Sequence, residues 1–306
     1  MLDRLIIATR ESPLALWQAN FVKAELEARH DGLLVELLGM RTQGDRWLQS
    51  PLSEVGGKGL FIKELEQALL DGRAHLAVHS MKDVPAALEA PFALPVIGFR
   101  DDVRDALVTR DGRGLADLPA GSRIGSASLR RQSQLRARRP DLQVAPIRGN
   151  VGTRLGKLEA GEFDALVLAS AGLKRLELAH RVAEYLETED SLPAAGQGAL
   201  GIECLADADD VRTLIDPLND PEVSVCVSAE REVSAGLGAD CSAPLGAHAV
   251  LDGGTLQLRA LLASPDGSRL LRAAATGGDP RAVGGEVVAS LREQGAVALL
   301  QSLDLP

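Results

Sequence analysis

The chain has few of the residues that mark several common classes of protein. Only 3% of its 306 residues are aromatic, which leaves few flat side chains on which single-stranded nucleic-acid bases could stack. The formal net charge is −10 and no helix-turn-helix or zinc-finger pattern is present, which also disfavours a nucleic-acid-binding protein. No apolar run approaches the roughly 18 residues of a membrane span. We therefore expect neither nucleic acid nor membrane among its partners.

Cysteines are also scarce, and their number is odd. Cys204, Cys226 and Cys241 match no zinc spacing and no disulfide framework. Cys204 lies in a predicted strand and Cys226 among the valines of a predicted helix, so both should be small core residues. Cys241 lies instead in GLGADCSAP, a loop of small residues and proline. A cysteine there is a candidate nucleophile or attachment point, although many exposed cysteines have neither role.

Two further absences concern metals and targeting. His75 and His79 lie four residues apart without an HExxH pattern, so we interpret both as structural and expect no metal site. The amino terminus, MLDRLIIATR, leads straight into a predicted strand and lacks the architecture of a signal peptide. We therefore expect a cytoplasmic protein.

The order of predicted elements indicates an α/β protein with more than one domain. A chain of 306 residues with 45% hydrophobic content can form two or three cores. The pattern predicts strands at residues 5–9, 33–42, 75–80, 122–126, 142–147 and 163–170, and helices at 14–29, 60–73, 128–139 and 151–161. Such alternation is typical of a mainly parallel sheet covered on both faces. Two doubly wound open-sheet lobes of this kind would bind a ligand in the cleft at the carboxyl ends of their strands.

The last part of the chain changes character. One helix follows Pro221, and strands are predicted at residues 245–251, 255–264 and 268–276, separated by the turn signals DGG and PDG. We expect a small α+β domain with a three-stranded antiparallel sheet. The predicted domains are residues 1–99 with 200–217, residues 100–199, and residues 218–306.

Arginine is concentrated in one short segment. Eight arginines and a single acidic residue, Asp141, lie between Gly121 and Arg154, although the whole chain is acidic. A guanidinium binds carboxylates and phosphates with two parallel hydrogen bonds, so this segment predicts a pocket for a small polyanion. The alternative is a basic outer helix paired with acidic neighbours from elsewhere in the chain, and we prefer it for Arg136, Arg138 and Arg139.

The remaining arginines of interest lie where predicted strands end. Ser126 and Ser128 precede the helix that begins with Arg130 and Arg131, where free backbone amides and the helix dipole favour an anion. The same relation holds near other strand ends, and the residues concerned are Arg10, Ser12, Arg148, Arg154 and Arg175. Such positions are hard to explain as solvated surface, so we predict one shared anion site.

Two further motifs lie in the first lobe. GGKG fails the Walker pattern, because Leu52 replaces the first glycine and Gly59 replaces Ser or Thr. A mobile lid that brings Lys58 near the ligand is the better interpretation, and a plain flexible loop is the alternative. HSMKDVP supplies Ser80, Lys82 and Asp83 after a predicted strand. A lone carboxylate among cations stays ionised and can stabilise positive charge that develops on a ligand; the alternative is a helix cap or an ion pair with Lys82.

These motifs occur in an order that resembles the porphobilinogen deaminase family, also called hydroxymethylbilane synthases. The matching segments, which run in order through nearly the whole chain, are ATRESPLALWQA, VGGKGLFIKELE, HSMKDVP, GSASLRRQ, RGNVGTRL, AGLKRL and SLPAAGQGALGIE. The resemblance implies a dipyrromethane cofactor linked through a thioether to Cys241. Around this cysteine the family tends to have Gly-Cys-Gln-Val-Pro, whereas here Asp240 precedes it and Ser-Ala-Pro follows. The added carboxylate should raise the thiol pKa. Leu205 stands where the family often has arginine, and we assign it no role.

The resemblance also implies a reaction and roles for the site residues. The enzyme would deaminate four porphobilinogens, join them head to tail on the dipyrromethane and release 1-hydroxymethylbilane for haem biosynthesis. Asp83 would stabilise the cationic azafulvene formed when ammonia leaves. Substrate carboxylates would be bound by Arg10, Ser12, Arg148, Arg154 and Arg175. The cofactor would be held by Ser80, Lys82, Asp83, Ser126, Ser128, Arg130, Arg131 and Arg154, and the lid loop would carry Lys58 and Phe61.

The resemblance further implies a fold like that of type II periplasmic binding proteins and a monomeric enzyme. An anion-binding protein that closes on its ligand without chemistry is the main competing class, but it would have no need of Cys241 on a third domain. Two connections between the lobes, near residues 99–105 and 193–201, are expected hinges.

Overall fold

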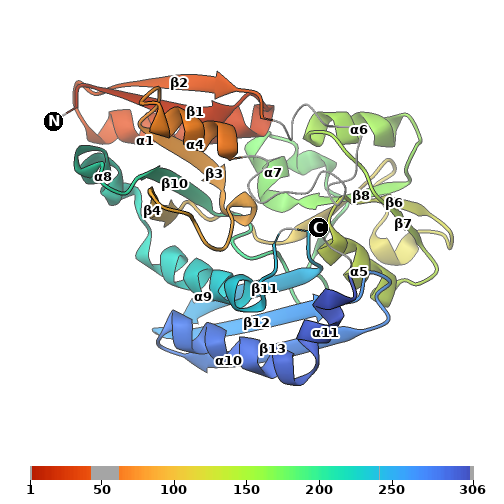
Figure 1. The fold of residues 1–306 in the computed structure, drawn as a ribbon. Helices are drawn as coiled ribbons and strands as arrows, with labels where there is room; N and C mark the ends of the chain where they lie inside the picture. Colours follow the sequence, from red (N-terminus) through yellow and green to blue (C-terminus); the bar gives the residue numbers. More distant parts are fainter. Residues whose placement is uncertain (1, 43–61, 241, 304–306) are drawn as a thin grey trace.

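The structure is a computed structural model that describes residues 2–42, 62–240 and 242–303. The predicted lid residues Lys58 and Phe61 and the predicted attachment residue Cys241 lie outside these ranges. The described strands form two five-stranded sheets and one three-stranded sheet, and each sheet is packed against helices (Figure 1). The predicted fold class, two open-sheet lobes with a small C-terminal α+β domain, is confirmed.

The first lobe is built on the sheet β2-β1-β3-β10-β4. Its strands are β1 (Arg4–Arg10), β2 (Leu34–Met40), β3 (Leu76–Ser80), β4 (Phe92–Gly98) and β10 (Leu200–Leu205), and its helices are α1 (Pro13–Arg29), α4 (Lys63–Leu70) and α8 (Asp209–Ile215). Successive side chains of β1 point to opposite faces. Leu5 and Ile7 pack with the buried face of α1, whereas Ala8 packs with α4. Helices therefore cover both faces of the sheet.

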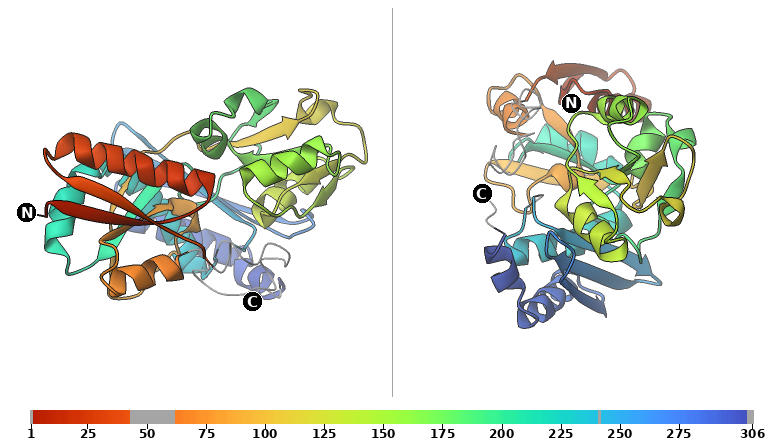
Figure 2. Two further views of the ribbon diagram at one scale, coloured as in Figure 1. Left: turned by 90° about the horizontal axis from the view of Figure 1, so that it is seen from above. Right: turned by 90° about the vertical axis from the view of Figure 1, so that its right-hand side faces the viewer.

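The second lobe repeats this plan with the sheet β7-β6-β8-β5-β9. Its strands are β5 (Asp105–Thr109), β6 (Arg123–Gly125), β7 (Gln143–Ala145), β8 (Ala165–Ala169) and β9 (Glu184–Leu186), and its helices are α5 (Leu129–Arg138), α6 (Val151–Glu159) and α7 (Ser170–Arg175). Two apolar cores, one on each face, include Leu107 and Val167 on one side and Ala106 and Leu168 on the other. Viewed from above, the two lobes lie side by side (Figure 2).

Both large sheets contain parallel and antiparallel pairs, so the expectation of mainly parallel sheets is only partly correct. Strand β10 runs antiparallel to β3 and β4, and β5 runs antiparallel to β8 and β9. These are the strands that follow the two crossings between lobes, from β4 to β5 and from β9 to β10. A strand that enters a sheet from the other lobe has no helical crossover of its own, so nothing requires it to run parallel.

The C-terminal part forms an antiparallel meander with helices against one face. It contains α9 (Pro221–Leu237), β11 (Leu245–Asp252), β12 (Thr255–Ala263), β13 (Leu270–Gly277), α10 (Pro280–Glu293) and α11 (Ala296–Gln301). Helices α9 and α10 contribute Val233 and Val287 to the core that they share with the sheet. Figure 1 shows these two helices beside the three strands. In the described part of the chain, no helix is both long and apolar enough to cross a membrane.

Candidate functional site

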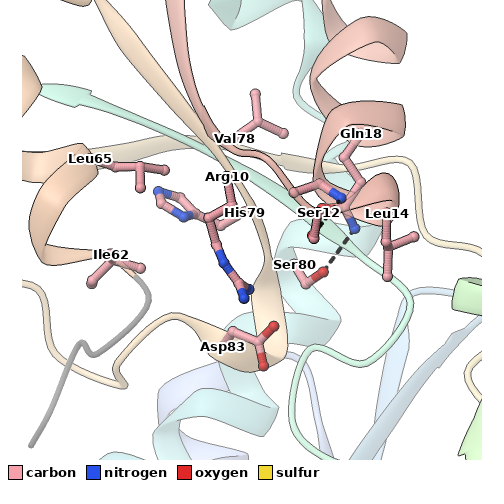
Figure 3. A pocket seen from close by; sticks show the side chains of 11 residues that line it. Arg10, Ser12, Leu14, Gln18, Ile62, Leu65, Val78, His79, Ser80 and Asp83 are labelled. Carbon is pink, nitrogen blue, oxygen red and sulfur yellow. Dashed lines mark hydrogen bonds between the residues drawn. The ribbon is translucent and has the colours of Figure 1, made fainter. Parts of the chain in front are cut away.

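A pocket opens at the carboxyl ends of β1 and β3 in the first lobe. Its lining includes the predicted site residues Arg10, Ser12, Ser80 and Asp83, and its empty volume is about 450 Å³ when its open mouth is included. Ser12 lies here because it caps α1, where its hydroxyl accepts a hydrogen bond from the Ala15 amide at 3.3 Å. The sequence analysis missed Gln18, whose side chain donates to the Ser80 hydroxyl at 2.8 Å (Figure 3).

Asp83 ends the short 3-10 helix Met81–Asp83, which directly follows β3. Its side chain is exposed, and Arg10 extends toward it from β1 (Figure 3). Lys82 beside it is half-buried. Burial, and next the positive charge of Arg131, lower the pKa of Lys82 to about 8, while Asp83 acts in the opposite direction. This loop of the first lobe therefore faces arginines of the second.

Arg154 extends the same group of charges. Burial, followed by the charges of Arg131 and Arg148, lowers the pKa of Arg154 to about 10, while Asp83 opposes that shift. Burial also lowers the pKa of Arg148. We call Lys82, Arg131, Arg148 and Arg154 the cationic cluster. These four cations are partly buried, and the positive charge around them exceeds the negative charge. A ligand with several carboxylates would therefore stabilise the cluster.

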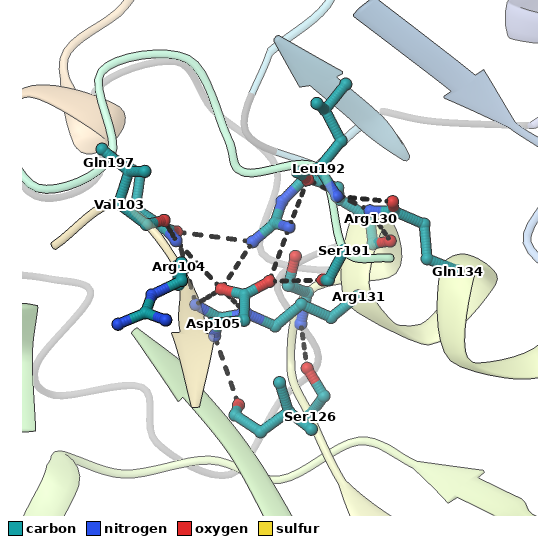
Figure 4. Close-up of polar contacts among 12 residues, drawn as sticks. Val103, Arg104, Asp105, Ser126, Arg130, Arg131, Gln134, Ser191, Leu192 and Gln197 are labelled. Atoms are coloured by element: carbon teal, nitrogen blue, oxygen red, sulfur yellow. Dashed lines mark hydrogen bonds and ion pairs between the residues drawn. The ribbon is translucent and has the colours of Figure 1, made fainter. Parts of the chain in front are cut away.

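Arg130 and Arg131 are less open to a ligand than the sequence suggested. Both are buried at the start of α5, and both form ion pairs of 2.8 Å with Asp105 on β5. Asp105 also accepts hydrogen bonds from Ser191 at 2.8 Å and from Gln197 at 2.9 Å (Figure 4). Arg130 and Arg131 therefore stabilise the second lobe through Asp105 and also contribute positive charge to the site.

The two serines predicted at the α5 terminus lie beside these arginines. The buried Ser126 hydroxyl accepts a hydrogen bond from the Ser128 amide at 3.3 Å, and the Ser126 carbonyl accepts one from Gln132 at 2.7 Å. Ser128 occupies the residue before α5, but its side chain makes no capping bond. The Ser128 hydroxyl is therefore not used to cap the helix.

Arg175 is the last residue of α7, the short helix that follows β8. Its guanidinium donates to the carbonyl oxygens of Phe99 at 3.2 Å and Gly198 at 2.6 Å. These two carbonyls belong to the two segments that cross between the lobes. Arg175 therefore ties both crossings to α7, and its predicted role as a substrate ligand stays a prediction.

The alternative interpretation of the outer arginines, pairing with acidic residues from elsewhere in the chain, is confirmed for Arg138 only, because the partner of Arg139 belongs to the same segment. Arg138 pairs with Asp190 at 2.7 Å and Arg139 with Asp141 at 2.7 Å. Arg136 donates instead to the carbonyl oxygens of Pro265 and Val144, which ties α5 to the C-terminal domain.

The described cysteines and histidines make the structural contacts expected of them. Cys204 and Cys226 are buried, and burial raises the pKa of both thiols. His75 accepts a hydrogen bond from the Ile6 amide at 2.9 Å, and His79 pairs with Glu203 at 2.7 Å. His79 also lines the pocket, which the sequence analysis did not expect. Near position 241, the Asp240 carboxylate accepts a hydrogen bond from the Ser242 amide at 2.8 Å.

Sequence reasoning missed Asp105 and Gln197, which organise the second lobe. Asp105 lies outside the arginine-rich segment, so a count of local charges could not include it. Gln197 did carry a signal, because it is a polar residue between two glycines in otherwise apolar sequence, AAGQGAL. It donates to the Val103 carbonyl at 2.6 Å and thereby links the two crossings.

Comparison with known proteins gives a consistent result. The family model described as porphobilinogen deaminase, dipyromethane cofactor binding domain, matches residues 5–213, and that of the C-terminal domain matches residues 224–293. A porphobilinogen deaminase of Chromobacterium violaceum is 57% identical over 276 residues, which cover 90% of this chain and 89% of that protein. One from Bordetella parapertussis is 55% identical over 303 residues, which cover 98% and 96%.

Among solved structures, the similarity is to periplasmic binding proteins and is distant. The aliphatic sulphonate binding protein SsuA of Escherichia coli gives a TM-score of 0.42 at 15% identity, covering 77% of this chain and 70% of that chain. A methionine binding protein, MetQ, gives 0.45 at 12% identity, covering 72% and 92%. The matches to the two domain models and to full-length relatives are much stronger, and by them the chain belongs to the porphobilinogen deaminase family.

Proposed function

We propose that the cleft containing the pocket and the cationic cluster is the active site in which the chain carries out the reaction of its family. The enzyme is a hydroxymethylbilane synthase with a dipyrromethane cofactor: it deaminates four porphobilinogens, joins them head to tail and releases 1-hydroxymethylbilane for tetrapyrrole biosynthesis. The observation that carries the proposed site is that Asp83 of the first lobe interacts with Lys82 and with Arg154 of the second lobe. Arg131 and Arg148 lie near Arg154 and complete the cluster. Each porphobilinogen brings an acetate and a propionate, which are the anions that such a cluster would bind.

The residues at this site fit the dipyrromethane cofactor. Two pyrrole units carry four carboxylates. The second lobe provides Arg131, Arg154 and the Ser128 hydroxyl, which does not cap α5, as hydrogen-bond donors for them. The buried Nε of Arg130 has no hydrogen-bond partner among the described residues, which leaves a donor for one of those carboxylates. We propose that the cofactor is attached to Cys241 and held by Ser80, Lys82, Asp83, Ser126, Ser128, Arg130, Arg131 and Arg154. When bound, it supplies the pyrrole carbon to which the first substrate is joined.

The substrate would occupy the pocket beside it. Arg10 and Ser12 line that pocket, and Arg148 and Arg154 lie across the cleft, so these side chains are placed to bind the acetate and propionate of porphobilinogen. We assign Arg175 to the same set with a second function, since its guanidinium also fixes the two crossings.

Asp83 has the role of stabilising positive charge. Its carboxylate is exposed to the cleft among cationic side chains, so its charge is available to the pyrrole N–H of a bound substrate. As ammonia leaves the aminomethyl carbon, positive charge spreads over the pyrrole, and a nearby carboxylate lowers the energy of that state. Lys58 and Phe61 would close over the site from the lid loop.

We further propose that the enzyme is a cytoplasmic monomer that binds porphobilinogen and no nucleic acid. The large exposed apolar residues of the described ranges are Leu34, Leu70, Val250 and Val297. They come from four different elements, whereas a stable dimer interface requires one large apolar patch. Light scattering of the purified protein would measure its mass, and a dimer would contradict this proposal.

The first test is the mass of the intact, denatured protein and of Cys241→Ser. We expect an adduct about the size of two porphobilinogens less their ammonia on the natural chain and none on the variant. Incubation of the natural protein with porphobilinogen should yield 1-hydroxymethylbilane. A chain that carries no adduct, even after incubation with preformed hydroxymethylbilane, and makes no product would overturn the proposal in favour of an anion-binding protein.

A further inference from the structure

A buried carboxylate–imidazole pair lies behind the pocket and has no role in the mechanism above. His79 on β3 and Glu203 on β10 are 6% and 0% exposed, and His79 Nε2 lies 2.7 Å from Glu203 Oε2. His79 reaches the pocket wall together with Arg10, Ser80 and Asp83. Figure 3 shows its imidazole between Leu65 and Arg10.

The geometry leaves one ring nitrogen of His79 with its lone pair. When Glu203 is ionised, it accepts the proton on Nε2, so Nδ1 is the unprotonated nitrogen. This arrangement holds the imidazole in one tautomer and one orientation, as carboxylates do for many histidines that accept protons.

Three further charges surround the pair. Glu66 on α4 is half-buried, and burial, followed by the charge of Glu203, raises its pKa, while His79 acts in the opposite direction. Arg10 and Asp83 face the same pocket. Glu203 Oε1 is buried without a hydrogen-bond partner among the described residues. A buried carboxylate with a spare acceptor stabilises a positive charge on its neighbour more strongly than a fully bonded one.

The proposed reaction requires a proton acceptor that Asp83 does not supply. In each joining step the C–N bond of one unit breaks, and ammonia leaves with the electron pair. A new C–C bond forms from the free α-carbon of the other pyrrole. The hydrogen on that α-carbon must then leave as a proton, so that its C–H electron pair restores the aromatic ring. If Asp83 took this proton, it would have to release it to solvent before it could stabilise the cation of the next unit, whereas a separate base keeps the charge of Asp83 in place throughout.

We propose that His79, held by Glu203, is the base that takes the α-proton after each C–C bond forms. The proton moves to Nδ1, the resulting imidazolium is stabilised by the Glu203 carboxylate, and the proton then passes to solvent through the mouth of the pocket. This inference rests on the proposed function, because it assigns a step of that reaction.

The test compares turnover of porphobilinogen with hydrogen or deuterium at the free α-carbon. A general base contributes about a hundredfold or more, so His79→Gln should lower kcat by about that factor while the cofactor stays attached. Deuterium should slow His79→Gln more than it slows the natural enzyme, because loss of the α-proton becomes the slow step. A purely structural role would lower the melting temperature without changing the isotope effect.

The matched control is His75→Gln, which removes a histidine from the opposite, amino-terminal end of β3. Its Nδ1 accepts a backbone hydrogen bond and it does not line the pocket, so the natural isotope effect should persist. If His79→Gln does not fold, Glu203→Gln keeps a hydrogen-bonding group of the same size beside His79 and should also enlarge the isotope effect. In the protein without substrate, ¹⁵N NMR should show that the neutral ring of His79 carries its proton on Nε2 and not on Nδ1.

The outcomes separate the two proposals. A natural enzyme that makes no hydroxymethylbilane contradicts the proposed function. A natural enzyme that makes product, together with an active His79→Gln whose isotope effect is unchanged, contradicts the role of His79 alone. A neutral His79 ring with its proton on Nδ1 in the free protein would also overturn it.

Discussion

Asp83 is one carboxylate among several cations, and its charge rather than its packing should matter. Its side chain is exposed, so Asp83→Asn should leave the melting temperature unchanged. Loss of one preorganised charge-stabilising group costs about 10²–10³ in rate, and kcat should fall by that factor while the mass still shows the cofactor. Asp190→Asn, which removes an exposed carboxylate from an ion pair on the outer face, should retain normal turnover. Near-normal turnover of Asp83→Asn would refute the role assigned to it.

Asp105 is the opposite case, since it is wholly buried and holds two buried arginines. Burial opposes its ionisation, but the charges of Arg130 and Arg131 more than compensate and hold the pKa of Asp105 well below its usual range. Removal of one partner from a buried ion pair costs about 3–5 kcal/mol. Asp105→Asn should therefore lower the free energy of unfolding by that amount, measured by urea denaturation at neutral pH.

The same carboxylate makes stability depend on pH. An aspartate with a depressed pKa stabilises the fold fully above its unfolded pKa of about 3.9, and this stabilisation is lost as the pH falls below that value. The free energy of unfolding should therefore decrease from about pH 4 downward, and Asp105→Asn should show a shallower decrease. Equal acid slopes for the two proteins would mean that the pKa of Asp105 is the same in the folded and the unfolded chain, which would contradict this prediction.

At the scale of the element, helix α9 supports the segment that follows Asp83. Arg231 on α9 donates to the carbonyl oxygens of Val84 at 3.1 Å, Pro85 at 2.6 Å and Ala86 at 3.0 Å. Arg231→Met keeps the apolar stem but removes these bonds, each of which, with a charged donor, contributes about 1.5–3 kcal/mol. We expect a lower melting temperature and faster hydrogen exchange of the Val84 amide. Arg272→Met, at an exposed position on β13, should change neither.

The sequence predicted the elements with strong local patterns. Helix α1 begins with Ser-Pro and has a long apolar face. The meander β11-β12-β13 has glycine-containing turns. Both could therefore be predicted from the local sequence. The strands β4, β5 and β9 were missed. β5 begins with a buried aspartate, and β9 has only three residues, so neither has a complete apolar run. The directions of β5 and β10 depend on crossings between lobes, which no local pattern contains.

The candidate site was likewise predictable from the sequence only in part. Arg10 and Ser80 end two parallel strands, and Ser12 and Asp83 follow those strands closely. The strand-end rule therefore correctly placed these four residues around one pocket. The rule could not show that Arg130 and Arg131 share Asp105. That carboxylate precedes them by 25 residues in the chain and is brought to them by a strand of reversed direction.

At the scale of the molecule, the two crossings between lobes act together. Arg100 donates to the Gln197 carbonyl at 3.2 Å, and the Asp101 amide donates to the Gly198 carbonyl at 3.2 Å. Gly198 has φ of +89°, and a Cβ there would collide with the Asp101 carbonyl oxygen. The crossings are therefore hydrogen-bonded side by side as a double hinge.

A double hinge of this kind predicts motion of the lobes as the product grows. We expect small-angle scattering of purified elongation intermediates to change stepwise as units are added, since the lobes must separate to admit a longer chain. The enzyme without added substrate provides the reference curve. Identical curves for all intermediates would contradict this prediction and place the needed space within a rigid cleft.

The reversed strands have a consequence for how the protein is made. The sheet of the second lobe is contiguous in the chain, from Asp105 to Leu186, whereas the sheet of the first lobe has β10 inserted between β3 and β4. During synthesis, β3 and β4 leave the ribosome about a hundred residues before the strand that joins them. The lobe encoded second is thus the first that can complete its sheet. A nascent chain that stops before Leu200 leaves the edges of β3 and β4 without their shared partner strand. Unpaired strand edges of this kind promote aggregation and are surfaces that chaperones cover.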